Sequence, residues 1–103
     1  MELRGKQKRF LRSQAHHLNP IFQIGKNGLN EGVLVQIAEA LEKRELIKIS
    51  LLQNTDEVAE DVATVLEAKI HCEVVQIIGR VLVLFKPSSK EKYQKISREV
   101  KTI

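Results

Sequence analysis

The chain has 103 residues, of which 43% are hydrophobic, 29% charged and only 4% aromatic, and its formal net charge is +4. That length suits one domain with its own core and excludes two independent cores. The longest apolar runs have only the length of a strand, and the basic start has no apolar region of a signal peptide. We therefore expect a cytoplasmic protein that neither spans nor binds a membrane.

Cysteine and histidine are scarce. The single Cys72 cannot form an internal disulfide and is expected to be a small, buried or half-buried apolar residue. The three histidines, His16, His17 and His71, have no metal-ligand spacing between them or with Cys72. The sequence therefore predicts neither a metal site nor a cofactor.

Positive charge is concentrated at both ends of the chain. Residues 1–30 hold six Lys or Arg against one acidic residue, residues 31–85 hold five against ten, and residues 86–103 hold six against two. Basic ends around an acidic middle are typical of a protein that binds a polyanion.

The first predicted element is a helix over residues 3 to about 18. Its apolar residues Leu3, Phe10, Leu11 and Leu18 fall within about 100° of a helical wheel, so we expect Phe10 in the core. The other faces carry four candidate RNA contacts, which are Lys6, Lys8, Arg9 and Arg12. A solvated charged face is the common alternative, but Glu2 alone offsets this charge locally, and a nucleic-acid contact is equally well supported.

A short strand is predicted over residues 21–24, and it leads into the motif Gly25-Lys26-Asn27-Gly28, called here the glycine loop. The two glycines allow positive φ and a close approach of the backbone to a ligand. A cation and the uncovered N–H groups of the following helix complete a combination that suits a phosphate. Most such motifs are ordinary turns, and this one matches neither a P-loop nor a dinucleotide-binding fingerprint.

Two further helices and a strand follow. Asn30 is the predicted N-cap of a helix that extends to about residue 43, and residues 46–52 alternate as a strand buried on one face. Asn54 and Glu57 resemble a capping box for a third helix that ends near residue 70. Its other faces are acidic, and its predicted buried row is Val58, Val62, Val65 and Leu66.

Strands over residues 73–78 and 81–85 form a predicted hairpin through a type II′ turn at Gly79-Arg80. Arg80 is a candidate phosphate contact, although a solvated hairpin tip is the commoner case. Residues 1–86 form the predicted domain, and residues 87–103 form a basic tail in which Ser89 is a candidate cap for a last helix. The whole order, α-β-α-β-α-β-β, predicts an α/β fold of two layers with a mixed four-stranded sheet. The glycine loop lies where ligands bind in open sheets, and the basic first helix is a candidate to share its surface.

Five separate blocks, in order and spacing, resemble the YhbY-like family of bacterial stand-alone CRM (chloroplast RNA splicing and ribosome maturation) domains. They are Gly5-Lys6-Gln7-Lys8-Arg9-Phe10-Leu11-Arg12, Ala15-His16-His17-Leu18-Asn19-Pro20, Gln23-Ile24-Gly25-Lys26-Asn27-Gly28, Glu45-Leu46-Ile47-Lys48 and Ile78-Gly79-Arg80-Val81-Leu82-Val83-Leu84. The resemblance implies a fold similar to the C-terminal domain of translation initiation factor three, with a KH-like glycine loop. It also implies a monomeric RNA-binding module that acts on precursors of the large ribosomal subunit.

Carried over to this sequence, the resemblance implies that Gly25, Lys26, Asn27 and Gly28 clamp the RNA backbone. The four cations of the first helix would extend that contact. With so few aromatic residues, we expect recognition of RNA backbone and shape more than of base sequence.

The sequence supports three interpretations of the function, of which the leading one is a non-enzymatic RNA-binding assembly factor. A phosphate-handling enzyme would need His16 or His17 as acid or base, but these adjacent helix residues are expected to diverge, and no catalytic constellation is evident. A protein-interaction adaptor would use the acidic third helix to bind a basic segment of a ribosomal protein.

Overall fold

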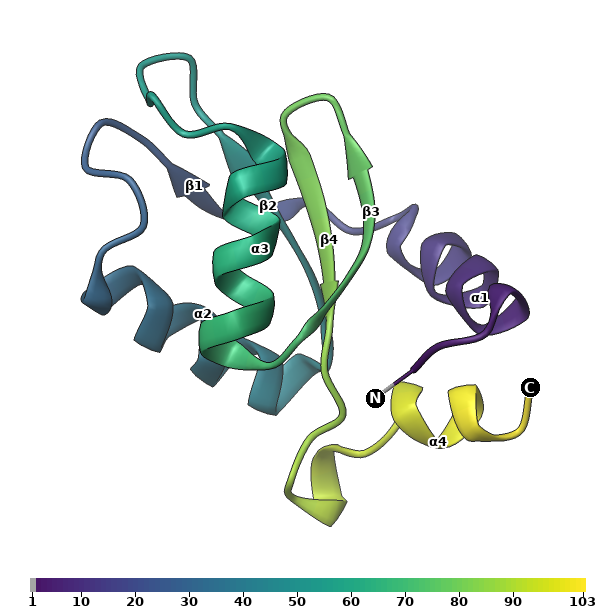
Figure 1. Ribbon diagram of the computed structural model, residues 1–103. Helices are drawn as coiled ribbons and strands as arrows, with labels where there is room; N and C mark the ends of the chain where they lie inside the picture. The colour runs from purple at the N-terminus through teal and green to yellow at the C-terminus, as the bar shows by residue number, and fades with distance from the viewer. Residues whose placement is uncertain (1) are drawn as a thin grey trace.

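The computed structural model describes residues 2–103, and its elements follow the predicted order with an added C-terminal helix (Figure 1). The elements are α1 (Gly5–Ala15), β1 (Pro20–Ile24), α2 (Glu31–Arg44), β2 (Leu46–Leu51), α3 (Ala59–Ile70), β3 (Glu73–Ile78), β4 (Val81–Phe85), a 3₁₀ turn η1 (Glu91–Tyr93) and α4 (Ile96–Lys101). No helix within residues 2–103 is long and apolar enough to cross a membrane.

The four strands form one mixed sheet in the order β1-β2-β4-β3. β1 and β2 are parallel, and β4 runs antiparallel to both of its neighbours, β2 and β3. Three strands therefore run in one direction, and β4 lies between two of them. The mixed four-stranded sheet predicted from the sequence is confirmed.

Helices cover both faces of this sheet. Along β4, Leu82 and Leu84 belong to the larger core cluster with α2 and α3, whereas Val83 and Phe85 belong to a second cluster with α1 and α4. This alternation explains why β4 is an unbroken apolar run, since a strand that is covered on both faces has no polar side. The second cluster goes beyond the expected two layers, because α1 and α4 add a partial third layer.

Two expectations for the first helix are corrected, and the expectation for Cys72 is confirmed. Leu18 lies beyond the end of α1 and is exposed, and Phe10 is half-buried at the rim of the second cluster beside Leu3 and Ile96. The buried position of that helix face is taken by Leu11 instead. Cys72 is buried as predicted, and burial raises the pKa of its thiol to about 11.

The third helix starts later than predicted, and its face is rotated. The Asn54–Glu57 capping box does not form, because the Glu57 N–H is bonded to Thr55 Oγ1 at 3.2 Å and the N-cap position is Val58. Val58 is 54% exposed and Val65 is also exposed. The row that faces the sheet is instead Ala59, Val62, Ala63, Leu66 and Ile70. Because these residues face the sheet, Val58 and Val65 lie on the outer side.

A buried carboxylate joins the C-terminal segment to the core. Glu45, the C-cap of α2, is 1% exposed and has a positive φ of 65°. Its carboxylate accepts the N–H groups of Ser88 at 2.8 Å, Lys95 at 2.9 Å and Ser97 at 3.1 Å. Burial acts to raise the pKa of Glu45, but the hydrogen bonds from the Ser97 side chain and these backbone groups outweigh it and hold the pKa below its usual value.

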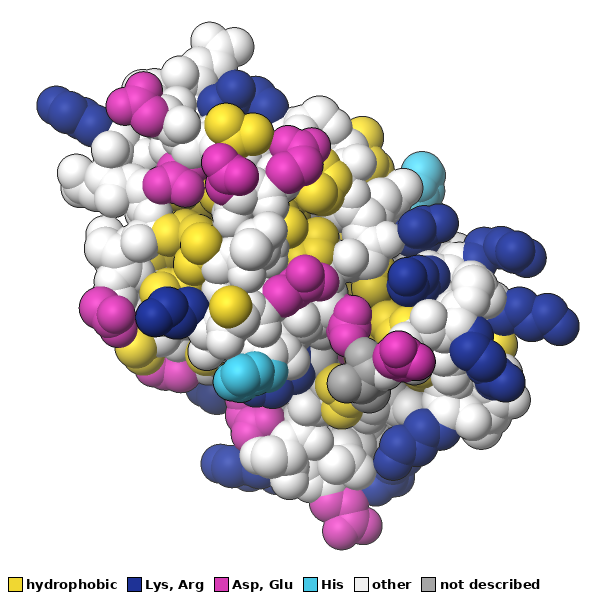
Figure 2. Space-filling model, in the orientation of Figure 1, with side chains coloured by type: hydrophobic (Ala, Val, Ile, Leu, Met, Phe, Trp, Pro, Cys, Tyr) yellow, Lys and Arg dark blue, Asp and Glu magenta, His cyan; other side chains and the backbone are white. Residues whose placement is uncertain are grey.

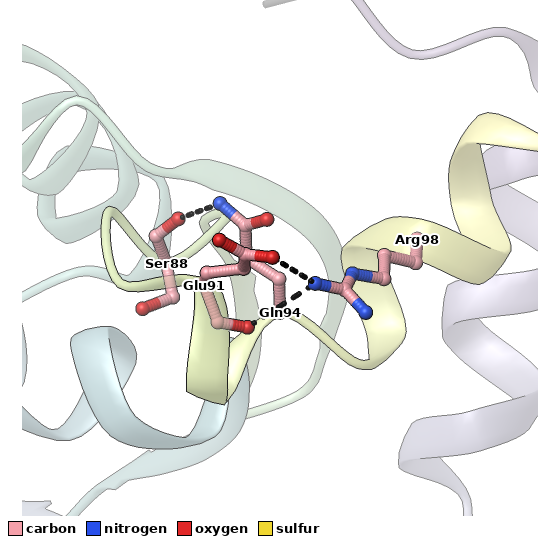
Figure 3. A network of polar contacts seen from close by, with 4 residues as sticks. All are labelled: Ser88, Glu91, Gln94 and Arg98. Atoms are coloured by element: carbon pink, nitrogen blue, oxygen red, sulfur yellow. Dashed lines mark hydrogen bonds and ion pairs between the residues drawn. The ribbon is translucent and has the colours of Figure 1, made fainter.

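Further polar contacts order the same segment. Glu42 accepts hydrogen bonds from Ser88 Oγ at 3.0 Å and from the Ser89 N–H at 2.7 Å, so Ser89 contacts α2 and does not cap the last helix. Figure 3 shows Gln94 donating to the Ser88 carbonyl at 2.9 Å and Arg98 beside the Glu91 carboxylate at 3.6 Å. The basic segment after residue 86 is therefore packed on the rest of the chain.

Candidate nucleic-acid interface

The glycine loop is a tight turn whose two central side chains point to solvent. The Gly28 N–H donates to the Gly25 carbonyl at 3.0 Å, and Lys26 and Asn27 are both exposed. Of the two glycines that allow a positive φ, Gly28 adopts one, of 63°, and Gly25 does not. A Cβ at Gly25 would lie 3.3 Å from the side chains of Asn54 and Leu52, so this glycine allows close packing against the loop that follows β2.

The surroundings of the loop are less positive than the sequence suggested. A Cβ at Gly28 would lie 2.8 Å from Glu57 Oε1, which puts a carboxylate directly beside the turn. At the start of α2, Asn30 Oδ1 accepts the Val33 N–H at 2.9 Å. This N–H group is therefore not available to a ligand, contrary to the expectation of uncovered N–H groups at the helix start. Asn30 is confirmed as the N-cap, and Glu31 in the first turn further offsets the positive end of the helix.

Arg80 lies at the same end of the sheet as the glycine loop. Because β1, β2 and β3 run in one direction, the loops that follow them meet at one edge, at the top of Figure 1. In the hairpin, Gly79 alone has a positive φ, of 58°, as the predicted type II′ turn requires. Arg80 Nε donates to the Leu51 carbonyl at 3.0 Å, and its Nη2 donates to the carbonyl of Leu52, the residue that packs on Gly25.

The four predicted cations of α1 form a separate basic surface. Lys6, Lys8, Arg9 and Arg12 are all exposed. Arg12 Nε donates to the Val75 carbonyl at 3.0 Å, which attaches α1 to β3. Within residues 2–103 the one ion pair is that of Arg98 with Glu91, so none of the four α1 cations forms an ion pair with a carboxylate of this part. The first turn of α1 holds no acidic residue either, so its positive helix end is not offset.

This basic surface does not adjoin the glycine loop. α1 packs against β2, β4 and β3, whereas the glycine loop follows β1 at the far edge of the sheet. Figure 1 shows the two well apart, on opposite sides of the molecule. In Figure 2, Lys and Arg side chains gather over α1, and acidic side chains lie over α3 and the loop before it. The structure thus has two separate candidate contacts for a polyanion. The first helix and the glycine loop do not share one surface, for which the sequence had made them candidates.

The two adjacent histidines come together, contrary to the expectation that they diverge. α1 ends at Ala15, so His16 is its C-cap and His17 lies in the turn beyond. Their ring centroids are 5.5 Å apart, with the ring planes at 82°. A helix that continued to residue 18 would have separated them, and the early end of α1 is the reason the prediction was wrong.

Comparison with known proteins gives a consistent result. The profile of the CRS1 / YhbY (CRM) domain matches residues 3–86. "Probable RNA-binding protein YqeI" of Bacillus subtilis strain 168 is 58% identical over 90 residues, which cover 87% of this chain and 94% of that protein. An "RNA-binding protein" of Haemophilus influenzae Rd is 43% identical over 89 residues, which cover 86% and 90%. The solution structure of SAV1595 from Staphylococcus aureus superposes with a TM-score of 0.73 at 46% identity, over 91% of this chain and 98% of that one.

Proposed function

The chain belongs to the CRS1 / YhbY (CRM) domain family, and on that premise we propose that it is a cytoplasmic RNA-binding protein that assists assembly of the large ribosomal subunit. Its RNA would be the precursor ribosomal RNA of that subunit, and its activity would be binding without catalysis. The observation that carries this proposal is the basic surface of α1, whose cations have no acidic partner within residues 2–103.

Unpaired cations near a helix N-terminus lower the stability of the helix, since the positive end of its dipole repels them. Lys6 and Lys8 are in or near the first turn of α1, where acidic side chains would be preferred. A polyanion relieves this repulsion, and each phosphate that contacts Lys or Arg also releases condensed counterions. RNA binding therefore accounts for a charge arrangement that folding alone disfavours.

The glycine loop would add a second contact to the RNA backbone. Lys26 and Asn27 are exposed at the tip of the turn, and Arg80 is held beside it by the carbonyls of Leu51 and Leu52. Nε and one Nη of Arg80 are occupied in this way, which leaves the N–H groups of its other Nη for a phosphate. We assign Gly25 and Gly28 to the close approach of the backbone.

The affinity for RNA should depend steeply on salt. If about five phosphates are engaged, the slope of log K against log salt concentration should be about −3.5 to −4.5. Replacing Lys6, Lys8 and Arg9 by Gln should reduce that slope by about 2 to 3, whereas Gln at Lys90, Lys92 and Lys101 removes the same charge elsewhere and should change it little. Binding measured from low to physiological salt on structured ribosomal RNA checks this, and a slope near zero would contradict the proposal.

The identity of the RNA is tested in cells. Ultraviolet crosslinking should recover large-subunit precursor RNA, and the crosslinked peptides should come from α1 and the glycine loop. Enrichment of messenger or transfer RNA in its place would contradict the ribosomal part of the proposal and leave RNA binding intact.

A second candidate function, an adaptor for a basic protein segment, is favoured by one observation. Val58, the N-cap of α3, and Val65 on α3 are exposed, although the sequence pattern predicted them to be buried, and acidic side chains flank them. An apolar stripe with an acidic rim suits an amphipathic basic segment of a ribosomal protein. Pull-downs before and after nuclease treatment separate the two functions, because only a partner held through RNA is released by nuclease.

A further inference from the structure

An open groove of about 430 Å³ lies between the C-terminal half of α1 and the edge strand β3. Its size falls in the range of small-molecule sites, about 300–1,000 Å³. The residues that line it are Arg12, Ser13, His16, His17, Gln76 and Ile78. None of them except Arg12 has a part in the RNA contacts proposed above.

The groove is lined by an apolar face and by side chains that can form hydrogen bonds with the polar edge of a ligand. Ile78 is 54% exposed, although it is the last residue of a strand in a largely apolar sheet. The perpendicular rings of His16 and His17 give an aromatic face on the other side of the groove. The Gln76 amide offers both donors and an acceptor. Apolar and aromatic faces with a few polar groups are what a planar heteroaromatic ring requires.

The groove also adjoins the basic surface of α1. Arg12 belongs to both, and its Nε is fixed to the Val75 carbonyl at 3.0 Å, which leaves its Nη groups free to meet a phosphate. A ligand bound in the groove is therefore well placed to be linked to a negatively charged backbone that lies over α1.

We propose that this groove binds one unpaired nucleobase of the RNA, with the ring between Ile78 and the histidine pair and its polar edge at Gln76. This inference rests on the proposed RNA binding and deepens it, because it adds a base contact to recognition that we otherwise assign to the backbone. An RNA strand on α1 would be anchored where one of its bases is unstacked, so single-stranded or bulged positions are preferred to continuous duplex.

The test compares RNA strands that carry the same phosphates with and without bases. Short strands of A, C or U and an abasic strand of equal length are titrated at fixed salt. The parent should bind at least one base-bearing strand about fivefold or more tighter than the abasic strand, as expected for one stacked base. Ile78→Ser together with Gln76→Ala should remove this difference and leave abasic binding and its salt slope unchanged.

Two further variants keep the test specific. Val35 is an exposed apolar residue on α2, outside the groove, and Val35→Ser should change neither binding nor the preference for bases. His16→Ala with His17→Ala should lose the preference, and phenylalanine at both positions should restore it, because either ring provides a stacking face. Melting temperatures establish that each variant is folded.

The possible failures are distinguishable. If the parent binds base-bearing and abasic strands equally, with a steep salt dependence, the groove is not a base site and RNA binding stands. If the preference exists but the groove variants keep it, the base is bound elsewhere and the proposal is overturned. If no short strand binds but structured ribosomal RNA does, this inference fails and RNA binding stands; if neither binds at any salt, both fail.

Discussion

Replacing Glu45 by alanine should lower the free energy of unfolding by about 3 kcal/mol or more. The carboxylate accepts three backbone N–H groups, from Ser88, Lys95 and Ser97, and two of these bonds are fully buried. A buried donor left without a partner costs about 1–3 kcal/mol, and bonds to a charged acceptor are stronger than neutral ones. Glutamate and alanine both carry a Cβ and meet the same steric cost at this positive φ, so the loss measures the carboxylate and not a change in backbone strain.

Urea unfolding of the two proteins measures this loss, and hydrogen exchange locates it. The N–H groups of Lys95 and Ser97 should exchange faster in Glu45→Ala, because the segment that carries α4 is no longer anchored to the end of α2. Glu42→Ala is the matched control, since Glu42 bonds only to Ser88 and Ser89 and should release less of the segment. Equal urea midpoints for Glu45→Ala and the parent would contradict the role assigned to this carboxylate.

The same contact predicts a dependence on pH. The pKa of Glu45 is lower in the folded state than in the unfolded chain, so its full contribution is present above the unfolded value of about 4.3. The unfolded chain takes up the proton first as the pH falls, and the contribution is lost as the pH drops through the folded value. The parent should therefore lose stability more steeply than Glu45→Ala as the pH falls below about 5.

Replacing Lys26 and Asn27 together by Asp should weaken RNA binding by at least about tenfold at 0.1 M salt. Both side chains are exposed at the tip of the glycine loop, so the fold should keep its stability within about 0.5 kcal/mol. The two new carboxylates would lie beside the existing Glu57 carboxylate, and together they would repel a phosphate that approaches the turn. Binding curves at fixed salt and melting temperatures measure both parts of the expectation.

Two control variants test whether charge at the glycine loop raises or lowers the affinity for RNA. Alanine at Lys26 and Asn27 should cost less affinity than Asp, because the backbone N–H groups remain and no repulsion is added. Glu57→Gln should raise the affinity, since it removes the negative charge next to Gly28 without a change in size. If the double-Asp variant binds as the parent does and Glu57→Gln has no effect, the glycine loop is only a turn, and α1 carries the RNA contact.

Much of the fold could be predicted from local patterns. The alternation in β2, the apolar run of β4, the turn at Gly79 and the N-cap Asn30 each depend on residues within a few positions of one another. These elements form as predicted because the tertiary packing favours the same local structure as the sequence patterns. The position of the glycine loop at the end of the first strand also followed from the sequence pattern, whereas the presence of Arg80 at the same sheet edge is known only from the structure.

The features that could not be predicted depend on contacts between distant segments. Glu45 looks like any polar residue at the end of a helix, and only the return of residues 88–97 makes it a buried acceptor. The exposure of Val58 and Val65 depends on which face of α3 packs on the sheet, and Ala59 and Ala63 belong to that buried face. The separation of α1 from the glycine loop depends on which strands α1 packs against, and the sequence of the helix does not indicate those strands.

The attachment of α1 to the far end of the chain bears on how the protein matures during its synthesis. Gln7 donates to the Val100 carbonyl, 93 residues later, and Leu11 and Val100 share one cluster. At about 5–20 residues per second, roughly 5–20 s of translation separate the two partners. The buried residues of the larger core end at Leu84 and include none of α1, whereas the second cluster includes both Leu11 and Val100. The basic helix therefore reaches its final position only after residue 100 has been made, whereas the larger core does not depend on that contact.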